Sequence, residues 1–439
     1  MRWTIETDIG IVPNDATIVS LEDCLSVIID HRGKTPKKLD SNWVKKGIPA
    51  ISAKNVHKGR LDNLSSIRYV TQEVYEKWMK DDIVKGDCFL VSEGATLGEV
   101  LYWDFDYPIV LSQRLFCIRT NPDVLYSKYF YAYMNTFNFQ RQVEARATGS
   151  SVDGLRQTEV LKLQVPIIPI ERQKFIGDLL YNLERKQKDL EEQNKTLETM
   201  AQTIFKEWFG KYQIGDELPE GWRLAKVSEF VRSSIGGDYG KETIEGDYTE
   251  ETICLRGTDL PDMKIGTPKK APIRFLKASK LERCKLENGD IVVEISGGTE
   301  NQSTGRAMYI NEKILSSAKH PMTCVNFCRI IRPLKIEYSY FLHSLFDYLY
   351  TRKVFFNWEN GTTGIKNLNL NALLEDFDLF IPKNEDSILD FNNNVQAVFN
   401  KIQTNNSQVQ SLTKTRDTLL PKLMSGQVRV NNIKQTANA

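Results

Sequence analysis

The sequence contains no long hydrophobic run. Over its 439 residues, no stretch approaches the roughly 18 uncharged apolar residues of a membrane-spanning helix. The segment from Met1 to Gly10 carries charges and has no apolar run, so we expect no signal peptide and no membrane contact. Cysteine is sparse, because the chain has only seven at scattered positions. An odd number of this kind argues against a disulfide framework and predicts a protein of the reducing cytoplasm.

An excess of charge of one sign is also missing. Lys and Arg together number 58 and Asp and Glu 57, which gives a net charge of +1. This balance excludes a uniformly basic nucleic-acid coat and an acidic tail protein, but it leaves room for local basic surfaces. Apolar residues make up 41% and charged residues 26%, so the chain can bury a core. Its length suggests about three units at roughly 150 residues each.

Motifs for catalysis are absent as well. An amino-adenine methyltransferase carries an Asn/Asp-Pro-Pro-aromatic loop, and the nearest segment, Asn121-Pro122-Asp123, does not match it. A phosphate-binding loop needs glycine five residues before its Gly-Lys pair and Ser/Thr after it, but Gly240-Lys241 has Ile235 and Glu242 in these places. The segment from Asp290 to Ser296 has serine where a nuclease site needs lysine. We interpret its two carboxylates as strand-edge residues.

Residues with metal-ligand spacing are missing too. Cys324 and Cys328 stand four apart without a second cysteine pair, which argues against a structural zinc. The four histidines show no ligand spacing, and we interpret them as ordinary surface or core residues. The sequence therefore predicts no metal site and no catalytic residue in this chain. These histidines are His31, His57, His320 and His343.

The sequence contains one arrangement of segments twice. Lys85 to Thr96 aligns with Asn288 to Thr299 at an offset of 203 residues, and Ile51 to Asn55 aligns with Leu255 to Asp259 at 204. Few residues are identical, so the evidence is the order of the matches. The period is far too long for a solenoid, and it predicts two copies of one domain, each followed by a helix. Further downstream, Leu155 and Ile167 to Pro169 match Leu368 and Phe380 to Pro382 at 213.

Each copy mixes strand-like and helix-like segments. Turn residues precede Cys88 to Val91 in the first copy, and the β-branched run Ile291 to Ile295 lies between glycine turns in the second. An aromatic helical stretch follows in each copy, at Ser127 to Thr136 and at Tyr338 to Tyr350. The pattern predicts two homologous domains of the α+β class, although it does not give the order of their strands.

A long amphipathic helix is predicted after each copy. From Glu171 to Phe209 there is no proline and a single glycine, Gly177, and apolar residues recur every seven positions. The second helix repeats this step, interrupted at Asn405, and a further seam at Ile388, Val395, Ile402 and Val409 accompanies it. The residues predicted to pair the helices are Ile176, Leu183, Leu190, Leu197, Ile204, Phe391, Val398, Leu412 and Leu419.

These heptads favour pairing of the two helices with each other. The alternative is that each helix packs on its own domain, but sustained heptad repeats usually pair with another helix. The first helix leads from copy one to copy two and the second begins at copy two, so pairing within one chain makes them antiparallel. About 39 residues span roughly 58 Å at 1.5 Å per residue. We therefore expect two mixed α/β domains separated by a pair of long antiparallel coiled-coil helices.

Two local basic runs stand out from the neutral average. The segment from His31 to Leu61 contains nine Lys/Arg residues and only one acidic residue, Asp40. A second basic run lies between Met263 and Lys285. Long basic side chains on loops can follow phosphates, whereas the alternative is a solvated charged surface. The glycine loops Ser92 to Thr96 and Ser296 to Thr299 are further candidates, or plain hairpin turns. The predicted DNA-binding residues are Arg32, Lys34, Lys37, Lys38, Lys54, Lys58, Arg60, Ser92, Thr96, Lys269, Lys270, Arg274, Lys277, Ser296 and Thr299.

Four further groups of residues stand in a fixed order along the chain: Leu218-Pro219-Glu220-Gly221-Trp222, Gly149-Ser150-Ser151 with Leu155 and Ile167-Ile168-Pro169, Gly361-Thr362-Thr363-Gly364 with Leu368 and Phe380-Ile381-Pro382, and Leu420-Pro421-Lys422-Leu423-Met424-Ser425-Gly426. Together with both heptad helices, these motifs resemble the DNA-specificity subunit of type I restriction-modification enzymes. The resemblance covers nearly the whole chain. The chain departs from the family pattern in three places: the Gly-Trp pair is missing after Val12-Pro13, Glu171-Arg172 replaces Glu-Gln, and the Glu-Gln pair is absent after Pro382.

The resemblance implies two target-recognition domains, each reading one half of a bipartite, asymmetric site in double-stranded DNA. The helices would set the gap between half-sites and dock two methyltransferase (modification) subunits, which endonuclease/translocase (restriction) subunits would join. S-adenosylmethionine, ATP and Mg would be bound by those partners and by no residue of this chain. The implied segments are recognition domains at 1–170 and 211–383, helical spacers at 171–210 and 384–426, and a tail at 427–439.

Two other functions remain open at this point. A stand-alone DNA-modifying enzyme with duplicated domains, a nuclease or methyltransferase, would turn over DNA without partners. A coiled-coil scaffold that binds only protein would show no salt-sensitive DNA binding. Both alternatives are therefore open to a direct test.

Overall fold

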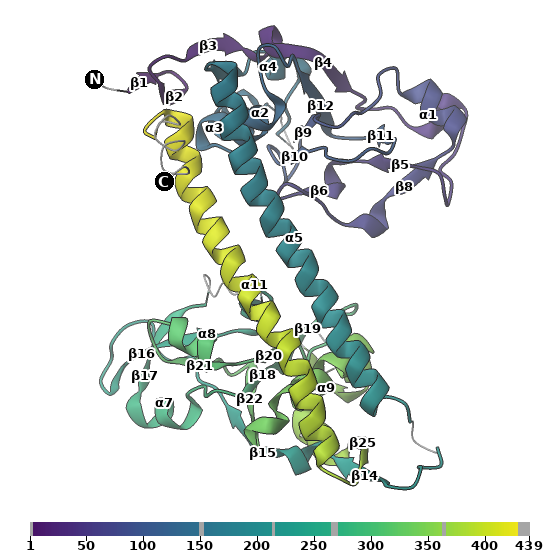
Figure 1. The fold of residues 1–439 in the computed structure, drawn as a ribbon, viewed down its shortest axis with the longest axis vertical. Coiled ribbons are helices and arrows are strands. Elements are labelled where there is room, and N and C mark those ends of the chain that lie inside the picture. The colour runs from purple at the N-terminus through teal and green to yellow at the C-terminus, as the bar shows by residue number, and fades with distance from the viewer. Residues whose placement is uncertain (1–2, 149–152, 213–215, 265–270, 362–365, 429–439) are drawn as a thin grey trace, which may run out of the picture. The chain divides into compact units, whose positions relative to one another are not determined.

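The computed structural model describes residues 3–148, 153–212, 216–264, 271–361 and 366–428 (Figure 1). The chain divides into two compact units. Unit 1 contains residues 1–186 together with the segment 412–439, and unit 2 contains the continuous stretch 187–411. Each unit mixes helices and sheets, which confirms the predicted α+β class.

A four-stranded antiparallel sheet, β10-β9-β12-β4, forms the centre of unit 1. Alternate side chains of β12 enter two different cores: Phe116 and Ile118 join one cluster, whereas Leu115 and Cys117 join the other. Because both faces are covered, the strands are apolar throughout. A three-stranded sheet, β11-β5-β8, covers one face and the helices α2 and α3 cover the other. The bounds are β4 Leu25–Asp30, β5 Ile48–Ile51, β8 Arg68–Val70, β9 Cys88–Val91, β10 Val100–Tyr102, β11 Val110–Leu111, β12 Leu115–Thr120, α2 Ser127–Met134 and α3 Phe137–Arg146.

Unit 2 repeats the topology of these two sheets. Its central sheet has the order β20-β18-β22-β15, and its second sheet, β21-β16-β17, contains one parallel and one antiparallel pair, as β11-β5-β8 does. In both units a strand near the start of the unit pairs with a strand after the two sheets, β3 with β13 and β14 with β25. The structure therefore confirms the predicted duplication and supplies the strand order. The bounds are β3 Thr17–Ser20, β13 Gln164–Ile167, β14 Trp222–Lys226, β15 Val231–Gly236, β16 Tyr248–Leu255, β17 Ile273–Lys277, β18 Ile291–Glu294, β20 Ala307–Tyr309, β21 Met322–Cys324, β22 Cys328–Pro333 and β25 Asp378–Pro382.

The repeated Gly-Asp motif explains how each central sheet begins. Gly86 and Gly289 have φ angles of +100° and +97°, in the left-handed region that favours glycine. The aspartate that follows each glycine is buried, and its carboxylate accepts a backbone hydrogen bond three residues upstream, of 2.9 Å for Asp87 and 2.7 Å for Asp290. An arginine of the neighbouring strand pairs with each carboxylate. The pairs are Arg119 with Asp87 at 2.8 Å and Arg332 with Asp290 at 3.0 Å.

The interpretation of Asp290 and Glu294 as strand-edge carboxylates is wrong. They flank and end β18, which lies between β22 and β20 in the interior of the sheet. Both side chains are buried, and Arg306 pairs with Glu294 at 2.6 Å much as Arg332 pairs with Asp290. A buried charge persists only when it is paired in this way. Sequence reasoning missed the arginines because they come from strands that are distant along the chain.

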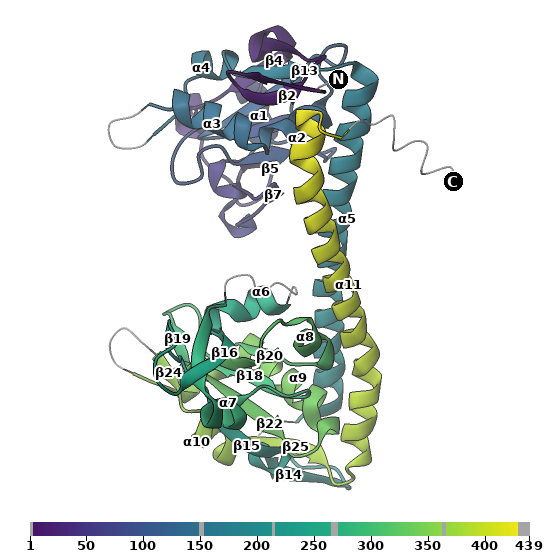
Figure 2. The ribbon, with the colours of Figure 1, turned by 90° about the vertical axis from the view of Figure 1, so that its left-hand side faces the viewer.

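Aromatic helices connect the sheets to the long helices within each unit. In unit 2, α9 (Ser339–Thr351) lies between the central sheet and the long helices, as Figure 2 shows. Its Phe341 packs at ring distances of 5.9 Å from Phe205 and 5.0 Å from Phe209. In unit 1, Tyr129 of α2 is fully buried in the cluster that also contains Ile176. Each unit therefore includes the long-helix segments that complete its core.

The two long helices are α5 (Ile170–Phe209) and α11 (Asp386–Ser425). Within unit 2, Asn194 contacts Asn406 and Phe205 contacts Phe391, so the helices run antiparallel there. Each helix begins and ends within two residues of the helical segments proposed from the sequence. Most of α11's second seam is deeply buried, including Val395 and Ile402. Of the residues predicted to pair the helices, Ile176, Leu190 and Phe391 are buried, whereas Leu183, Leu197, Ile204, Val398, Leu412 and Leu419 are half-buried.

Candidate nucleic-acid interface

A cleft of about 920 Å³ in unit 1 brings two predicted regions together. Lys54, from the basic run, stands on one side, and Thr96, from the glycine loop, stands on another. The turn before β12, with Arg114, provides a third part of the lining. The cleft therefore combines cationic and hydroxyl groups, which are the groups that contact phosphates and base edges.

A short 3-10 helix, η3 (Ala53–Asn55), positions Lys54 at the cleft. Ser52 and Asn55 form a capping box, in which the backbone N–H of Ser52 donates to Asn55 Oδ1 at 3.1 Å. The amide of buried Asn55 also donates to the Asn63 carbonyl at 3.2 Å and to Ser66 Oγ at 3.0 Å. Because these bonds fix the backbone, the exposed Lys54 side chain starts from a rigid base.

The turn between β9 and β10 forms another wall, and it is a hairpin connection as well as a lining of the cleft. The N–H of Ser92 donates to the Arg114 carbonyl at 2.9 Å, and the Ser92 carbonyl accepts from Leu155 at 2.7 Å. The Ser92 side chain is buried, so it does not reach the cleft. Arg114 pairs with Glu93 at 2.9 Å, and its side chain is 55% exposed. This guanidinium can therefore be reached by a ligand.

The predicted basic residues of unit 1 fall into two groups. Arg32 pairs with Asp30 at 2.6 Å and donates to the Leu155 carbonyl at 2.9 Å, so it supports the fold. Lys34 donates to the Trp78 carbonyl at 2.8 Å, and burial lowers the pKa of its ammonium group. Both are half-buried, and their partners explain the positive charge without any ligand. In contrast, Lys37, Lys38, Lys54 and Lys58 are exposed, and Arg60 is half-buried on β7 (Arg60–Leu61).

Sequence reasoning missed two arginines that line the cleft. Arg68 lies on β8 with its guanidinium 3.9 Å from the ring centroid of Trp43, a distance typical of a cation–π contact. Arg114 has a φ angle of +63°, which is unusual for a residue other than glycine. Neither belongs to a run of basic residues. The isolated arginine before an apolar strand was the only available signal for Arg114.

The predicted residues of unit 2 are placed differently. Arg274 donates to Tyr239 Oη at 2.8 Å and pairs with Glu242 at 3.0 Å, while Lys277 pairs with Asp247 at 3.3 Å. Ser296 belongs to a strand, β19 (Ser296–Gly298), which pairs with β24 (Lys366–Leu368) instead of forming a loop. Thr299 is exposed and accepts from the Gln302 N–H at 3.1 Å. Lys269 and Lys270 lie outside the described residues, as do Gly149-Ser150-Ser151 and Thr362-Thr363-Gly364.

The face of unit 2 that corresponds to the cleft has equivalent backbone hydrogen bonds and different side chains. Its 3-10 helix, η6 (Gly257–Asp259), is capped by Arg256, which donates to Asp259 at 2.9 Å. The N–H of Ile295 donates to the Phe327 carbonyl at 2.9 Å, as Ser92 does to Arg114. Phe327 itself is 58% exposed. The two units therefore present different chemistry on equivalent frames.

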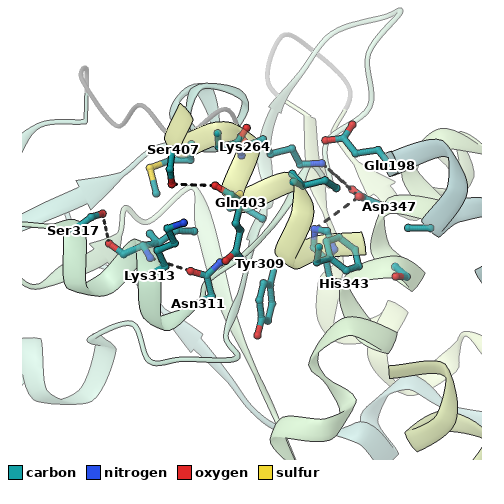
Figure 3. Close-up of a pocket in the computed structure, with 18 of the residues that line it drawn as sticks. Glu198, Lys264, Tyr309, Asn311, Lys313, Ser317, His343, Asp347, Gln403 and Ser407 are labelled. Carbon is teal, nitrogen blue, oxygen red and sulfur yellow. Dashed lines mark hydrogen bonds and ion pairs between the residues drawn. The ribbon is translucent and has the colours of Figure 1, made fainter. Parts of the chain in front are cut away.

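A pocket of about 270 Å³ in unit 2 lies beside α11 (Figure 3). Lys264, from the second basic run, pairs there with Asp347 at 3.1 Å. The side-chain amide of Asn406 donates a hydrogen bond to the backbone carbonyl of Lys264. Burial lowers the pKa of His343 to about 4, so this histidine is neutral at pH 7. Burial also raises the pKa of the Glu198 carboxyl. Because the charges compensate one another, this cluster holds α6 (Leu260–Lys264), α9 and α11 together.

Within the described parts of the chain, no cluster of three or more histidine, cysteine or acidic residues has the spacing of a metal site. The helices in those same parts are also too short or too polar to cross a membrane.

The fold and the site define a class: a protein with duplicated α+β units, long paired helices and two unequal polar faces. Residues 13–199 match the family described as "Type I restriction modification DNA specificity domain". The chain is 23% identical to the type I restriction enzyme MjaIX specificity subunit of Methanocaldococcus jannaschii, over 98% of each chain. It is 25% identical to the putative MjaX specificity subunit of that organism, over 51% of this chain and 54% of the relative.

A solved structure has the same fold. The crystal structure of a type I restriction-modification S subunit from M. genitalium superposes with a TM-score of 0.59 at 16% sequence identity. The superposition covers 93% of this chain and 96% of that one. The chain is therefore similar in sequence to type I restriction-modification specificity subunits, and it shares its fold with this solved S subunit.

Proposed function

We propose that the chain is the DNA-reading subunit of its system, with each unit reading one half of a bipartite, asymmetric site in double-stranded DNA. The observation that carries this proposal is the pair of equivalent faces with unequal chemistry. Lys54, Arg68 and Arg114 line the face of unit 1, whereas Arg256 and Phe327 mark that of unit 2. Identical frames with identical side chains would favour a symmetric target, so the difference supports an asymmetric one.

The chemistry of the unit 1 cleft suits a duplex. Cationic side chains attract phosphates and set affinity, while hydroxyl and amide groups such as those of Thr96 and Gln113 can read base edges. Glu93 balances Arg114 in the absence of DNA, so the guanidinium can exchange a carboxylate for a phosphate or a base. We place three further exposed lysines of the prediction, Lys37, Lys38 and Lys58, at the phosphate backbone.

We propose further that the long helices dock two methyltransferase subunits, which restriction subunits join, and set the gap between the half-sites. The partners then bind S-adenosylmethionine, ATP and Mg, and this chain contributes recognition only. Compensated ion pairs such as Lys264–Asp347 support a non-catalytic role, because their charges are already neutralised within the fold.

A domain exchange tests the proposal. Residues 211–383 are replaced by the second recognition domain of another family member, and methylated adenines are mapped in cells that carry the complete system. The expected result is a new sequence in one half-site beside an unchanged other half-site. A change in both half-sites at once would contradict independent reading, and DNA turnover by the purified chain alone would favour the stand-alone enzyme.

A further inference from the structure

Arg114 and Phe327 occupy the same place in the two units. Each residue directly precedes a central strand, β12 or β22, and each carbonyl accepts a 2.9 Å hydrogen bond from the turn after β9 or β18. Two residues upstream, the N–H of Ser112 donates to the Ile51 carbonyl at 2.8 Å and that of Val325 to the Leu255 carbonyl at 2.9 Å. The hydrogen bonds at and before the position are therefore equivalent, although Arg114 has a positive φ angle and Phe327 does not.

The two side chains differ in charge and in partners. Arg114 pairs with Glu93, but the residue equivalent to Glu93 is Ser296, so a hydroxyl group replaces the carboxylate at this position. The ring of Phe327 is 58% exposed and makes no aromatic or cation–π contact with any of the described residues. Single exposed apolar residues are common, so exposure by itself carries no argument. Phe327 is distinguished by its position, which is equivalent to that of Arg114 at the cleft of unit 1.

The backbone around Phe327 is held by hydrogen bonds. Val325 accepts from the Cys328 N–H at 2.9 Å, which closes a tight turn around Phe327. On η6 of the same unit, Thr258 is exposed at the position equivalent to Lys54, and Arg256 is held by Asp259. An uncharged ring in this setting adds nothing to the attraction of phosphates, but it can contact the apolar surface of a base pair.

We propose that Phe327 is a specificity-determining residue of unit 2, whose ring makes an apolar contact with a base pair of the second half-site. This inference rests on the proposed function. Two forms of the contact share the same chemistry: packing on a thymine methyl group in the major groove, or insertion of the ring at a base step. Arg114 serves the first half-site through charge and hydrogen bonds at the equivalent place.

The test uses the full chain assembled with its methyltransferase subunits, and the target is first mapped from methylated adenines in cells. Phe327→Ala is compared with Ile336→Ala, which removes another exposed apolar side chain of the same unit, 52% exposed in the wild type. Thermal melting of both variants checks the fold. Phe327→Leu provides a second variant that keeps an apolar side chain.

For Phe327→Ala we expect roughly tenfold weaker binding to the mapped target, with an unchanged slope of binding constant against salt. One position of the second half-site should become degenerate, while the first half-site stays fixed. Ile336→Ala should match the wild type. Deoxyuridine in place of thymine should weaken wild-type binding if the ring packs on the methyl group, and a 2-aminopurine probe should brighten if the ring inserts.

Wild-type affinity and an unchanged methylation motif in Phe327→Ala would overturn this inference and leave the proposed function intact. A wild-type complex with no sequence-specific binding or methylation would overturn the proposed function, and this inference with it. If Phe327→Ala instead bound all sequences uniformly more weakly, with a reduced salt slope, the inference about Phe327 would also be overturned, because that pattern is typical of phosphate contacts.

Discussion

Units 1 and 2 share their frame and differ on their faces. The frame includes the left-handed glycines Gly86 and Gly289 and the buried Asp–Arg pairs that follow them, with partner distances that agree within a few tenths of an ångström. The faces carry Arg114 with Glu93 in one unit and Phe327 with Ser296 in the other. The comparison teaches that the residues that stabilise each unit are distinct from the residues that we propose for recognition, so each set can be changed without the other.

The largest expected effect comes from breaking the frame of one unit. Asp290→Ala leaves Arg332, which is only 16% exposed, without its buried partner. We expect a loss of about 3–5 kcal/mol, the usual cost of an uncompensated buried charge. Calorimetry combined with limited proteolysis should show early unfolding of unit 2 only. Asp87→Ala is the matched variant, and it should shift the effect to unit 1; equal damage to both units by either variant would contradict separate frames.

Acid should weaken unit 2 through His343. Its folded pKa of about 4 lies below the usual value near 6.5, because burial disfavours the charged ring. The unfolded chain therefore binds the proton more readily, so stability is present above pH 6.5 and is lost as pH falls towards 4. Between pH 7 and pH 5 we expect a loss of roughly 2 kcal/mol from this group.

His343→Gln should make the melting temperature of unit 2 less dependent on pH between pH 7 and pH 5. His31 in unit 1 has a folded pKa of about 4 for the same reason, burial, with Lys34 nearby. His31→Gln is therefore the control, and it should flatten the curve of unit 1 alone. An unaltered pH profile in His343→Gln would show that other groups set the acid limit of unit 2.

The residues between α5 and α11 also differ between the units, with a smaller expected effect. In unit 2 the buried Asn194 donates to Asn406 at 2.7 Å and accepts from Asn405 at 2.9 Å. In unit 1 the helices contribute apolar residues, Ile176 and Leu423, to one core cluster. Asn194→Leu should cost about 1–3 kcal/mol, since it leaves buried amides unpaired. Replacing all three asparagines by leucine should recover most of this loss in urea unfolding. A triple variant no better than the single one would contradict an amide-pairing role.

The smallest effect concerns the salt dependence of DNA binding in unit 1. Lys54→Ala should weaken binding to the mapped target and to random DNA alike, and it should lower the slope of log binding constant against log salt by about 1. Lys77→Ala is the matched control, because Lys77 is an exposed lysine of α1 (Gln72–Trp78) that pairs with Glu73 at 2.5 Å. Equal slopes for the two variants would remove Lys54 from the proposed interface.

The sequence predicted the frame better than the faces. Glycine turns and apolar runs are local signals, so β9, β18 and both long helices could be located along the chain. Strand order depends on pairings between distant segments, such as β12 with β4, and no local pattern encodes them. The partners of Arg32 and Lys34, the carbonyls of Leu155 and Trp78, are equally distant in sequence. A run of basic residues therefore could not reveal which of them support the fold.

Unit 1 is assembled from both ends of the described chain, whereas unit 2 is one continuous piece. This difference has a consequence for the timing of synthesis. Unit 2 has all of its residues once Ser411 has left the ribosome, but the core of unit 1 also needs Leu423 and Met424. The N-terminal segment of unit 1 therefore waits for packing partners that are translated only after unit 2. A nascent chain that stops early exposes the apolar surface around Ile176 and Leu180, so quality control can recognise it before it reaches DNA.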